Sequence, residues 1–180
     1  MRKLALRALP LAIASVFLMG IVAARSPAFA QGSKKDYLSD NEADQIRDAD
    51  TPNDRIKLFI GFAADRIKKL QYEFAHPGEL HRDDRINTLL NAYAGCIDDA
   101  SDAIQLGVDK QQDVRGAIKE MQSRAPEFLT YLKTLSAKGQ AVEAYKDNLD
   151  DAIDATNEAI NDAADAIKEN APPPVRRKPQ

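Results

Sequence analysis

Apolar residues recur at spacings of three and four over several long stretches of this chain, and this periodicity most constrains its fold. Such spacing places one stripe of side chains on one face of an α-helix. After residue 30 the sequence has no sustained apolar-polar alternation and no Asn-Gly or Asp-Gly pair, so the usual signals of strands and hairpins are missing. The sequence therefore predicts an all-α protein.

Capping residues mark where the first two helices begin. Ser39 and Glu42 have the spacing of a capping box, which predicts a short helix that ends near Asp50. Thr51 followed by Pro52 predicts the start of a second helix, because proline at the first helical position gives up an N–H that has no partner there.

Glycine and proline divide the rest of the chain into three further helices. The second helix should end at residues 76–78, and a third should run over 79–107, with Gly107 closing it. A fourth is expected over residues 110–137, and a fifth is expected after Lys138-Gly139, to about residue 170. In the fourth helix we expect Pro126 to cause a kink or a brief break while the buried face continues across it.

The apolar stripes of the long helices predict the core. Its expected members are Ile56, Phe59, Ile60, Ala63, Ile67, Leu70 and Phe74; Ile86, Leu89, Leu90, Tyr93, Ile97, Ala100 and Ile104; Val114, Ile118, Met121, Ala125, Phe128, Leu132 and Leu135; and Val142, Tyr145, Leu149, Ala152, Ile153, Thr156, Ile160, Ala163 and Ile167. A helix with one apolar stripe gains most of its stability from packing against others. Four long helices joined by short turns therefore predict an antiparallel four-helix bundle over residues 36–170, with a short additional N-terminal helix.

The first 30 residues have the pattern of an export signal. Arg2, Lys3 and Arg7 precede an apolar stretch over residues 8–24, and Ala28-Phe29-Ala30 supplies the small residues that signal peptidase requires. Cleavage before Gln31 is the expected outcome, which places the protein in the periplasm or outside the cell. After cleavage we expect no stable membrane insertion.

Retention of the leader as a membrane anchor is the alternative, since an apolar stretch of 17 residues is at the short limit for a membrane-spanning helix. Pro10 and Gly20 weaken such a helix, and Arg25 follows it directly. A lipid-modified N-terminus would need a cysteine just after the apolar stretch, whereas Cys96 is the single cysteine of the sequence.

Charge limits the partners of the chain. The whole sequence has 25 basic and 28 acidic residues, and the leader holds four of the basic ones and no acidic one, so the part after residue 30 has a formal charge of −7. Nucleic acids and anionic membranes would repel such a chain, whereas basic proteins or divalent cations would be attracted.

The two ends of the mature chain are expected to lie outside the bundle. We expect residues 31–35 to be a flexible lead-in and residues 171–180 to be a disordered tail. The tail contains three prolines and three basic residues before the final Pro-Gln.

A single cysteine forms no disulfide within the chain, so hydrophobic burial must hold the fold together. Cys96 lies among apolar residues, and we expect it to be a buried small hydrophobic residue.

Seven carboxylates on the last predicted helix form the most regular polar pattern of the sequence. At 100° per residue they share one face opposite the apolar stripe. We call this set the acidic ridge: Asp147, Asp151, Asp154, Glu158, Asp162, Asp165 and Glu169. It is interpreted either as a solvated face or as a docking strip for a basic protein or weakly held divalent cations.

The remaining motifs assign no catalytic residue, metal ligand or cofactor. Residues 48–54 resemble the start of a calcium loop but lack its glycine and its final glutamate. Glu73 and His76 match one Glu-x-x-His element, whereas a di-iron bundle needs two. His76 is better explained by the favourable field at a helix C-terminus. His81 has no cysteine nearby that would complete a zinc site and is expected at the surface.

The tripeptide Asp-Arg-Ile begins at residues 54, 65 and 84. We interpret it as helix patterning, because the intervals between its copies define no structural repeat.

Three segments, Leu-Ser-Asp-Asn-Glu-Ala-Asp-Gln-Ile-Arg-Asp-Ala over residues 38–49, Pro-Asn-Asp-Arg-Ile-Lys over 52–57 and Phe-Ala-Ala-Asp-Arg-Ile over 62–67, are similar to segments of uncharacterised exported helical proteins of bacteria. The resemblance implies export and a helical fold, and it brings no assigned activity. The leading hypothesis from the sequence is an exported, non-catalytic helical-bundle protein of the cell envelope with a binding or structural role. A periplasmic bundle that binds a metal or a cofactor is the alternative.

Overall fold

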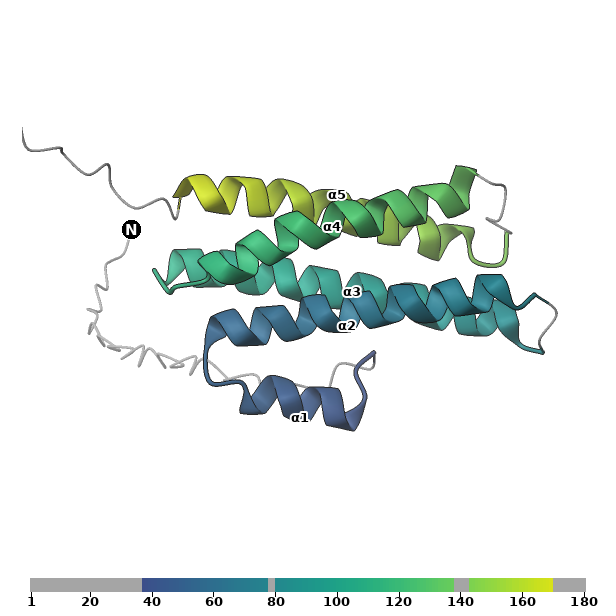
Figure 1. The fold of residues 1–180 in the computed structure, drawn as a ribbon, viewed down its shortest axis with the longest axis horizontal. Helices are drawn as coiled ribbons and strands as arrows, with labels where there is room; N and C mark the ends of the chain where they lie inside the picture. The colour runs from purple at the N-terminus through teal and green to yellow at the C-terminus, as the bar shows by residue number, and fades with distance from the viewer. Residues whose placement is uncertain (1–36, 78–79, 138–142, 170–180) are drawn as a thin grey trace, which may run out of the picture. The chain divides into compact units, whose positions relative to one another are not determined.

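The computed structural model describes residues 37–77, 80–137 and 143–169, and helices account for most of them (Figure 1). In chain order these helices are α1 (Asp40–Asp48), α2 (Pro52–Ala75), α3 (Arg82–Asp109), α4 (Arg115–Ala137) and α5 (Lys146–Glu169). Within the described ranges there is no strand, so the prediction of an all-α protein is confirmed. The predicted leader, lead-in and tail, together with Val142, lie outside the described residues.

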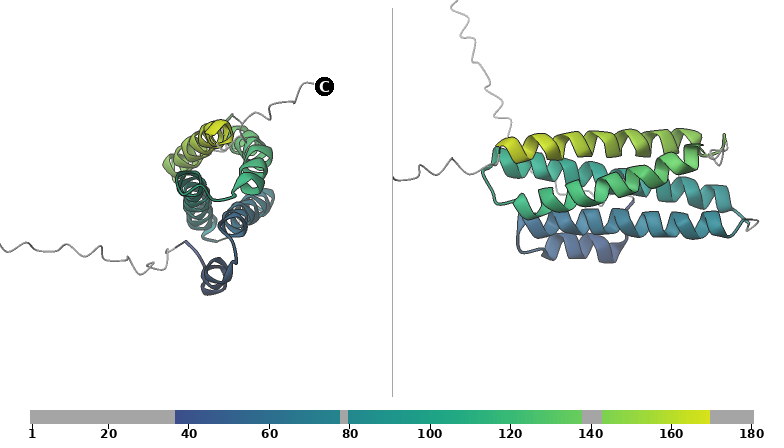
Figure 2. Two further views of the ribbon diagram at one scale, coloured as in Figure 1. Left: turned by 90° about the vertical axis from the view of Figure 1, so that its left-hand side faces the viewer. Right: turned by 45° about the horizontal axis from the view of Figure 1, so that its top comes forward.

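The helices pack side by side as a bundle (Figures 1 and 2). α2 packs against α3 and α4, and α5 packs against the same two helices. The short helix α1 lies along α2. The apolar stripes of α2, α3, α4 and α5 meet in one core, whose largest fully buried side chains include Tyr93, Ile56, Leu90 and Met121.

The predicted starts of α1 and α2 are confirmed. The Ser39 hydroxyl accepts a hydrogen bond from the Glu42 amide at 3.3 Å, and the Ser39 amide donates to the Glu42 carboxylate at 2.9 Å. These two bonds complete the capping box of α1. In α2 the Thr51 hydroxyl accepts from the Asp54 amide at 3.1 Å, with Pro52 in the first turn. Residues 48–54 thus serve helix ends, as their capping chemistry indicates.

The third helix differs from its prediction at both ends. It begins at Arg82, because His81 has a left-handed backbone with a φ of 59°. It continues past Gly107 to Asp109, so the expectation that Gly107 closes this helix is wrong. The absence of a side chain at Gly107 makes room for Val114 instead, since a Cβ atom at residue 107 would lie 2.5 Å from Cγ1 of Val114.

α4 starts later than predicted and continues through its proline. Gln111, with a φ of 55°, reverses the chain after α3, and α4 begins only at Arg115. Pro126 lies inside this helix, so of the two expected outcomes, a kink or a brief break, the break is not observed. The buried face passes from Met121 to Phe128 across the proline, as expected.

The inward face of α5 is rotated from its predicted position. Ile167, expected in the core, is 37% exposed, and Ile153 and Ile160 are only partly buried. The buried residues of this helix are Leu149, Ala152, Thr156, Ala159, Ala163 and Ala166. Small side chains at the centre of the face leave room for bulky partners from α3 and α4, and the isoleucines flank the contact. The prediction for Ile167 is therefore wrong.

None of the described helices contains an apolar stretch long enough to cross a membrane.

Two helical glycines give a matched test of this packing. Nothing lies within 4 Å of the position that a Cβ atom would take at Gly61, so Gly61→Ala should raise the free energy of unfolding by about 0.5–1 kcal/mol. Gly107→Ala should lower it by about 1–2 kcal/mol, because the clash with the buried Val114 exceeds the gain in helix propensity. Urea unfolding followed by far-UV circular dichroism measures both. Equal effects of the two substitutions would contradict the packing of Gly107 against Val114.

Candidate functional site

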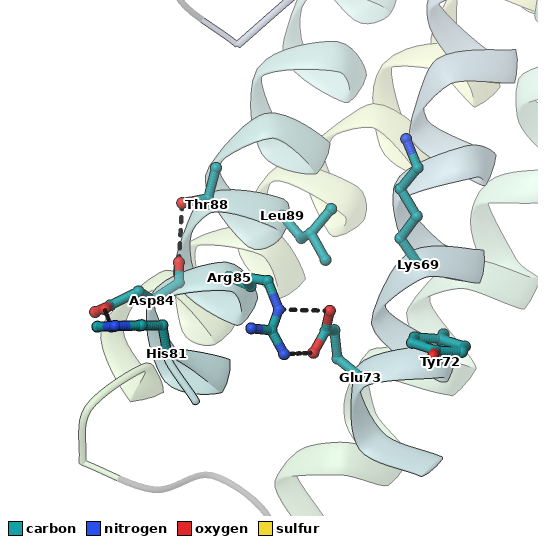
Figure 3. A pocket seen from close by; sticks show the side chains of 8 residues that line it. All are labelled: Lys69, Tyr72, Glu73, His81, Asp84, Arg85, Thr88 and Leu89. Carbon is teal, nitrogen blue, oxygen red and sulfur yellow. Dashed lines mark hydrogen bonds and ion pairs between the residues drawn. The ribbon is translucent and has the colours of Figure 1, made fainter. Parts of the chain in front are cut away.

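A surface hollow of about 420 Å³ lies where the end of α2 meets the start of α3 (Figure 3). Its lining combines ionisable groups with apolar surface from both helices. The residues that form this hollow are Lys69, Tyr72, Glu73, His81, Asp84, Arg85, Thr88 and Leu89.

The end of α2 is fixed by His76. Its backbone N–H donates to the Tyr72 carbonyl at 3.1 Å, and its Nδ1 atom lies 2.8 Å from the same oxygen. The two rings stack with their centroids 4.1 Å apart. This C-cap agrees with the predicted position of His76 at a helix end, and it holds Tyr72 at the rim of the hollow.

An ion pair joins the two helices across the hollow. Arg85 of α3 donates from Nε and Nη2 to the two carboxylate oxygens of Glu73 on α2, each at 2.8 Å. Its Nη1 atom donates to the Leu80 carbonyl at 2.6 Å. The hydrogen bonds from Arg85 hold the pKa of Glu73 below its usual value. Glu73 is mostly covered, with 11% of its side chain exposed, so this two-point contact fixes the floor of the hollow.

Other polar groups of the lining also have partners within the chain. Lys69 Nζ lies 2.7 Å from a carboxylate oxygen of Asp65, and His81 Nδ1 lies 3.3 Å from one of Asp84. Thr88 donates to the Asp84 backbone carbonyl at 2.8 Å. The polar rim is thus held in place by its own contacts.

Two large side chains of this region are exposed. Tyr72, which lines the hollow, is 54% exposed, and Leu80, whose backbone carbonyl accepts from Arg85, is 80% exposed. Leu89, which lines the hollow, is partly buried. A concave, partly apolar surface with a fixed polar rim is suited to hold an apolar group of a ligand or partner. Comparison of the chain with protein-family models, curated proteins and solved structures gave no match.

The acidic ridge lies mainly on the outer face of α5. Six of its seven residues are exposed, and Asp162 is partly buried. Asp162 accepts a hydrogen bond from the Ser101 hydroxyl of α3 at 2.8 Å, and Asp165 pairs with Lys168 at 2.7 Å. The ridge therefore has one member at the contact with α3, while the others face outward.

Other residues considered from the sequence have structural contacts. Cys96 is buried, as predicted. Glu73 of the Glu-x-x-His element contacts Arg85, whereas His76 caps its helix. Among residues 37–77, 80–137 and 143–169, no three His, Cys, Asp or Glu side chains are grouped so as to hold a metal ion.

The arginines of the Asp-Arg-Ile tripeptides make contacts that the sequence analysis missed. Each arginine reaches from its own helix to another part of the chain: Arg55 to the Ile46 carbonyl, Arg66 to the Glu42 carboxylate, and Arg85 to that of Glu73. Each is followed by a buried isoleucine, at 56, 67 or 86, which keeps the arginine at the edge of the core. The recurring tripeptide was the available signal for these contacts.

Proposed function

We propose that this chain is an exported, non-catalytic protein that binds a partner protein in the cell envelope, with a mature part built as an antiparallel four-helix bundle. The proposal rests on the exposed ring of Tyr72 at the hollow, together with the exposed Leu80 between α2 and α3. Large aromatic side chains are frequent anchors of protein interfaces. The ion pairs of Glu73 with Arg85 and of Lys69 with Asp65 favour binding over catalysis, because a charged group already engaged in an ion pair is less available for proton transfer.

The lengths of the helices and of their connections support the proposed arrangement. α2, α3, α4 and α5 are long, and short segments separate them. Helices joined by short segments pack most readily in opposite directions. α1 is then an addition to the four-helix core.

The net charge favours a basic protein as the partner. The hollow supplies the apolar anchor, and the acidic ridge supplies attraction at longer range. These contributions should differ in their response to salt, because ions screen charges over about 8–10 Å at physiological ionic strength and leave a buried apolar contact nearly unchanged. Weakly bound divalent cations are the alternative ligands of the ridge.

Capture from cell-envelope extract tests the proposal with three variants of the mature chain. A hollow variant carries Tyr72→Ala and Leu80→Ser, and a ridge variant carries Asp147→Asn, Asp151→Asn, Asp154→Asn and Glu158→Gln. The matched control neutralises four exposed carboxylates on other helices: Asp48→Asn, Asp102→Asn, Asp109→Asn and Glu127→Gln.

The hollow variant should lose the captured basic protein at all salt concentrations. The ridge variant should capture less of it at low salt and match the wild type at high salt. The control variant should behave as the wild type. Capture that is the same for the wild type, the hollow variant and the ridge variant would exclude both surfaces and contradict the proposed function.

Export is supported by the pattern of the first 30 residues. Protein recovered from the periplasm should have an intact mass that corresponds to a start at Gln31. Ala30→Leu should block cleavage, because signal peptidase requires a small residue at this position, whereas Ala24→Leu in the apolar stretch should leave cleavage intact. A wild-type chain that keeps residues 1–30 in the membrane fraction would instead support the anchor.

A further inference from the structure

The helix α1 is held to the bundle by few contacts: near its C-terminal end Arg55 of α2 donates to the Ile46 carbonyl at 3.2 Å, and Ile46 is partly buried, while the other contacts lie at its N-terminal end. No residue of α1 itself is fully buried. The two residues before its cap make further contacts: Leu38 is buried, and the Tyr37 hydroxyl donates to the Asp99 carboxylate of α3. The Tyr37 ring lies against Gly95, where an added Cβ atom would be 2.6 Å from Cε1 of the ring. Gly95 thus forms a notch that the tyrosine occupies.

A charged contact beside this notch holds the first turn of α1. Both terminal nitrogens of Arg66 on α2 donate to the Glu42 carboxylate, Nη2 at 2.7 Å, and Nη2 also donates to the Tyr37 carbonyl at 3.2 Å. The exposed fractions of the Arg66 and Glu42 side chains are 7% and 15%. The hydrogen bonds from Arg66 lower the pKa of Glu42 to about 2, so this carboxylate is charged at neutral pH.

The surface beneath α1 needs an occupant. Without residues 37–48, the Gly95 notch would be empty, and Arg66 would keep only the longer contact of 3.7 Å with the Asp65 carboxylate. Weakening the pairing of a covered charge is costly. A segment that supplies a tyrosine and a glutamate five residues later would satisfy this surface, and the chain itself carries such a segment.

The connection between α1 and α2 permits release of that segment as a unit. Ala49 and Thr51 have extended backbones with ψ of 123° and 154°, and neither has a positive φ. Pro52 restricts the residue before it to such conformations. The capping box lies within residues 39–42, so it would travel with α1.

We propose that residues 37–48 exchange between two copies of this chain. Tyr37 of each copy fills the Gly95 notch of the other, and Glu42 of each copy pairs with Arg66 of the other. The two contacts are then equivalent under two-fold symmetry. A second copy is the favoured occupant because its segment supplies both the ring for the notch and the carboxylate for the guanidinium. The short connection favours the contact within one chain, so exchange becomes populated at high protein concentration. This inference is independent of the proposed function.

Charge reversal tests the exchange in the mature chain. Glu42→Arg alone places two guanidinium groups together, and Arg66→Glu alone places two carboxylates together. A mixture of the two variants restores an opposite-charge pair at both contacts only if their segments exchange. The matched control carries both substitutions in one chain, which restores the pair without exchange.

Two measurements follow the exchange. Native mass spectrometry measures the association of two copies. The rate of maleimide labelling of Cys96, the residue after Gly95, measures how well residues 37–48 cover the notch.

Each single variant should remain helical and should label Cys96 roughly tenfold faster than the wild type, because its segment opens more often. The mixture should form a heterodimer and return labelling to the wild-type rate. The double variant should stay monomeric at dilution with slow labelling. A mixture that stays monomeric and labels rapidly, while the double variant is protected, would overturn the exchange.

If a reversed charge prevents folding, Tyr37→Ala and Gly95→Leu form the second pair. The first variant keeps an intact notch and lacks the ring, and the second keeps the ring and lacks the notch. Their mixture should form a dimer through one intact contact, whereas neither variant should dimerise alone. If this mixture formed no dimer at high protein concentration, the proposed exchange would be contradicted, as in the charge-reversal test.

Discussion

The structure depends on mutual burial of helix faces, and Tyr93 shows how these faces are joined. Its side chain is fully buried on α3, and its ring makes an edge contact with Phe128 of α4, with the centroids 5.9 Å apart. Its hydroxyl lies 2.7 Å from that of Thr156 on α5. Thr156 donates its proton to the Ala152 carbonyl, so Tyr93 is the donor between the two hydroxyls. One residue thus joins three helices, and no polar atom of this contact is left unsatisfied.

Ion pairs at the edges of this core position the segments that burial alone leaves loose. Arg85 fixes the α2–α3 end through Glu73, and Arg66 fixes α1 through Glu42. Partly exposed pairs add modest stability, but their two-point geometry selects one arrangement of neighbouring segments. Ion pairs likewise engage Glu73, Arg85 and Lys69 around the hollow, which is why binding is the better proposal for this surface than proton transfer.

Local patterns in the sequence predicted local features well. Ser39, Thr51 and Pro52 marked helix starts correctly, because capping depends on residues within one turn. The exposure of Ile167 and the space required at Gly107 were missed, because each depends on side chains of other segments. The partners of Arg66 and Arg85 lie 24 and 12 residues away, and periodicity within a helix contains no information about them. The hollow was likewise missed, since it exists only where two helix ends meet.

We infer that α2, α3, α4 and α5 form one cooperative unit through burial, with α1 attached as a separately releasable segment. Native-state hydrogen exchange tests it most directly, because it measures the free energy of opening at each amide. We predict one shared opening free energy for the most protected amides of the four long helices, and a clearly lower value for the amides of α1. Protection of α1 equal to that of the four, or independent opening of α5, would contradict the account.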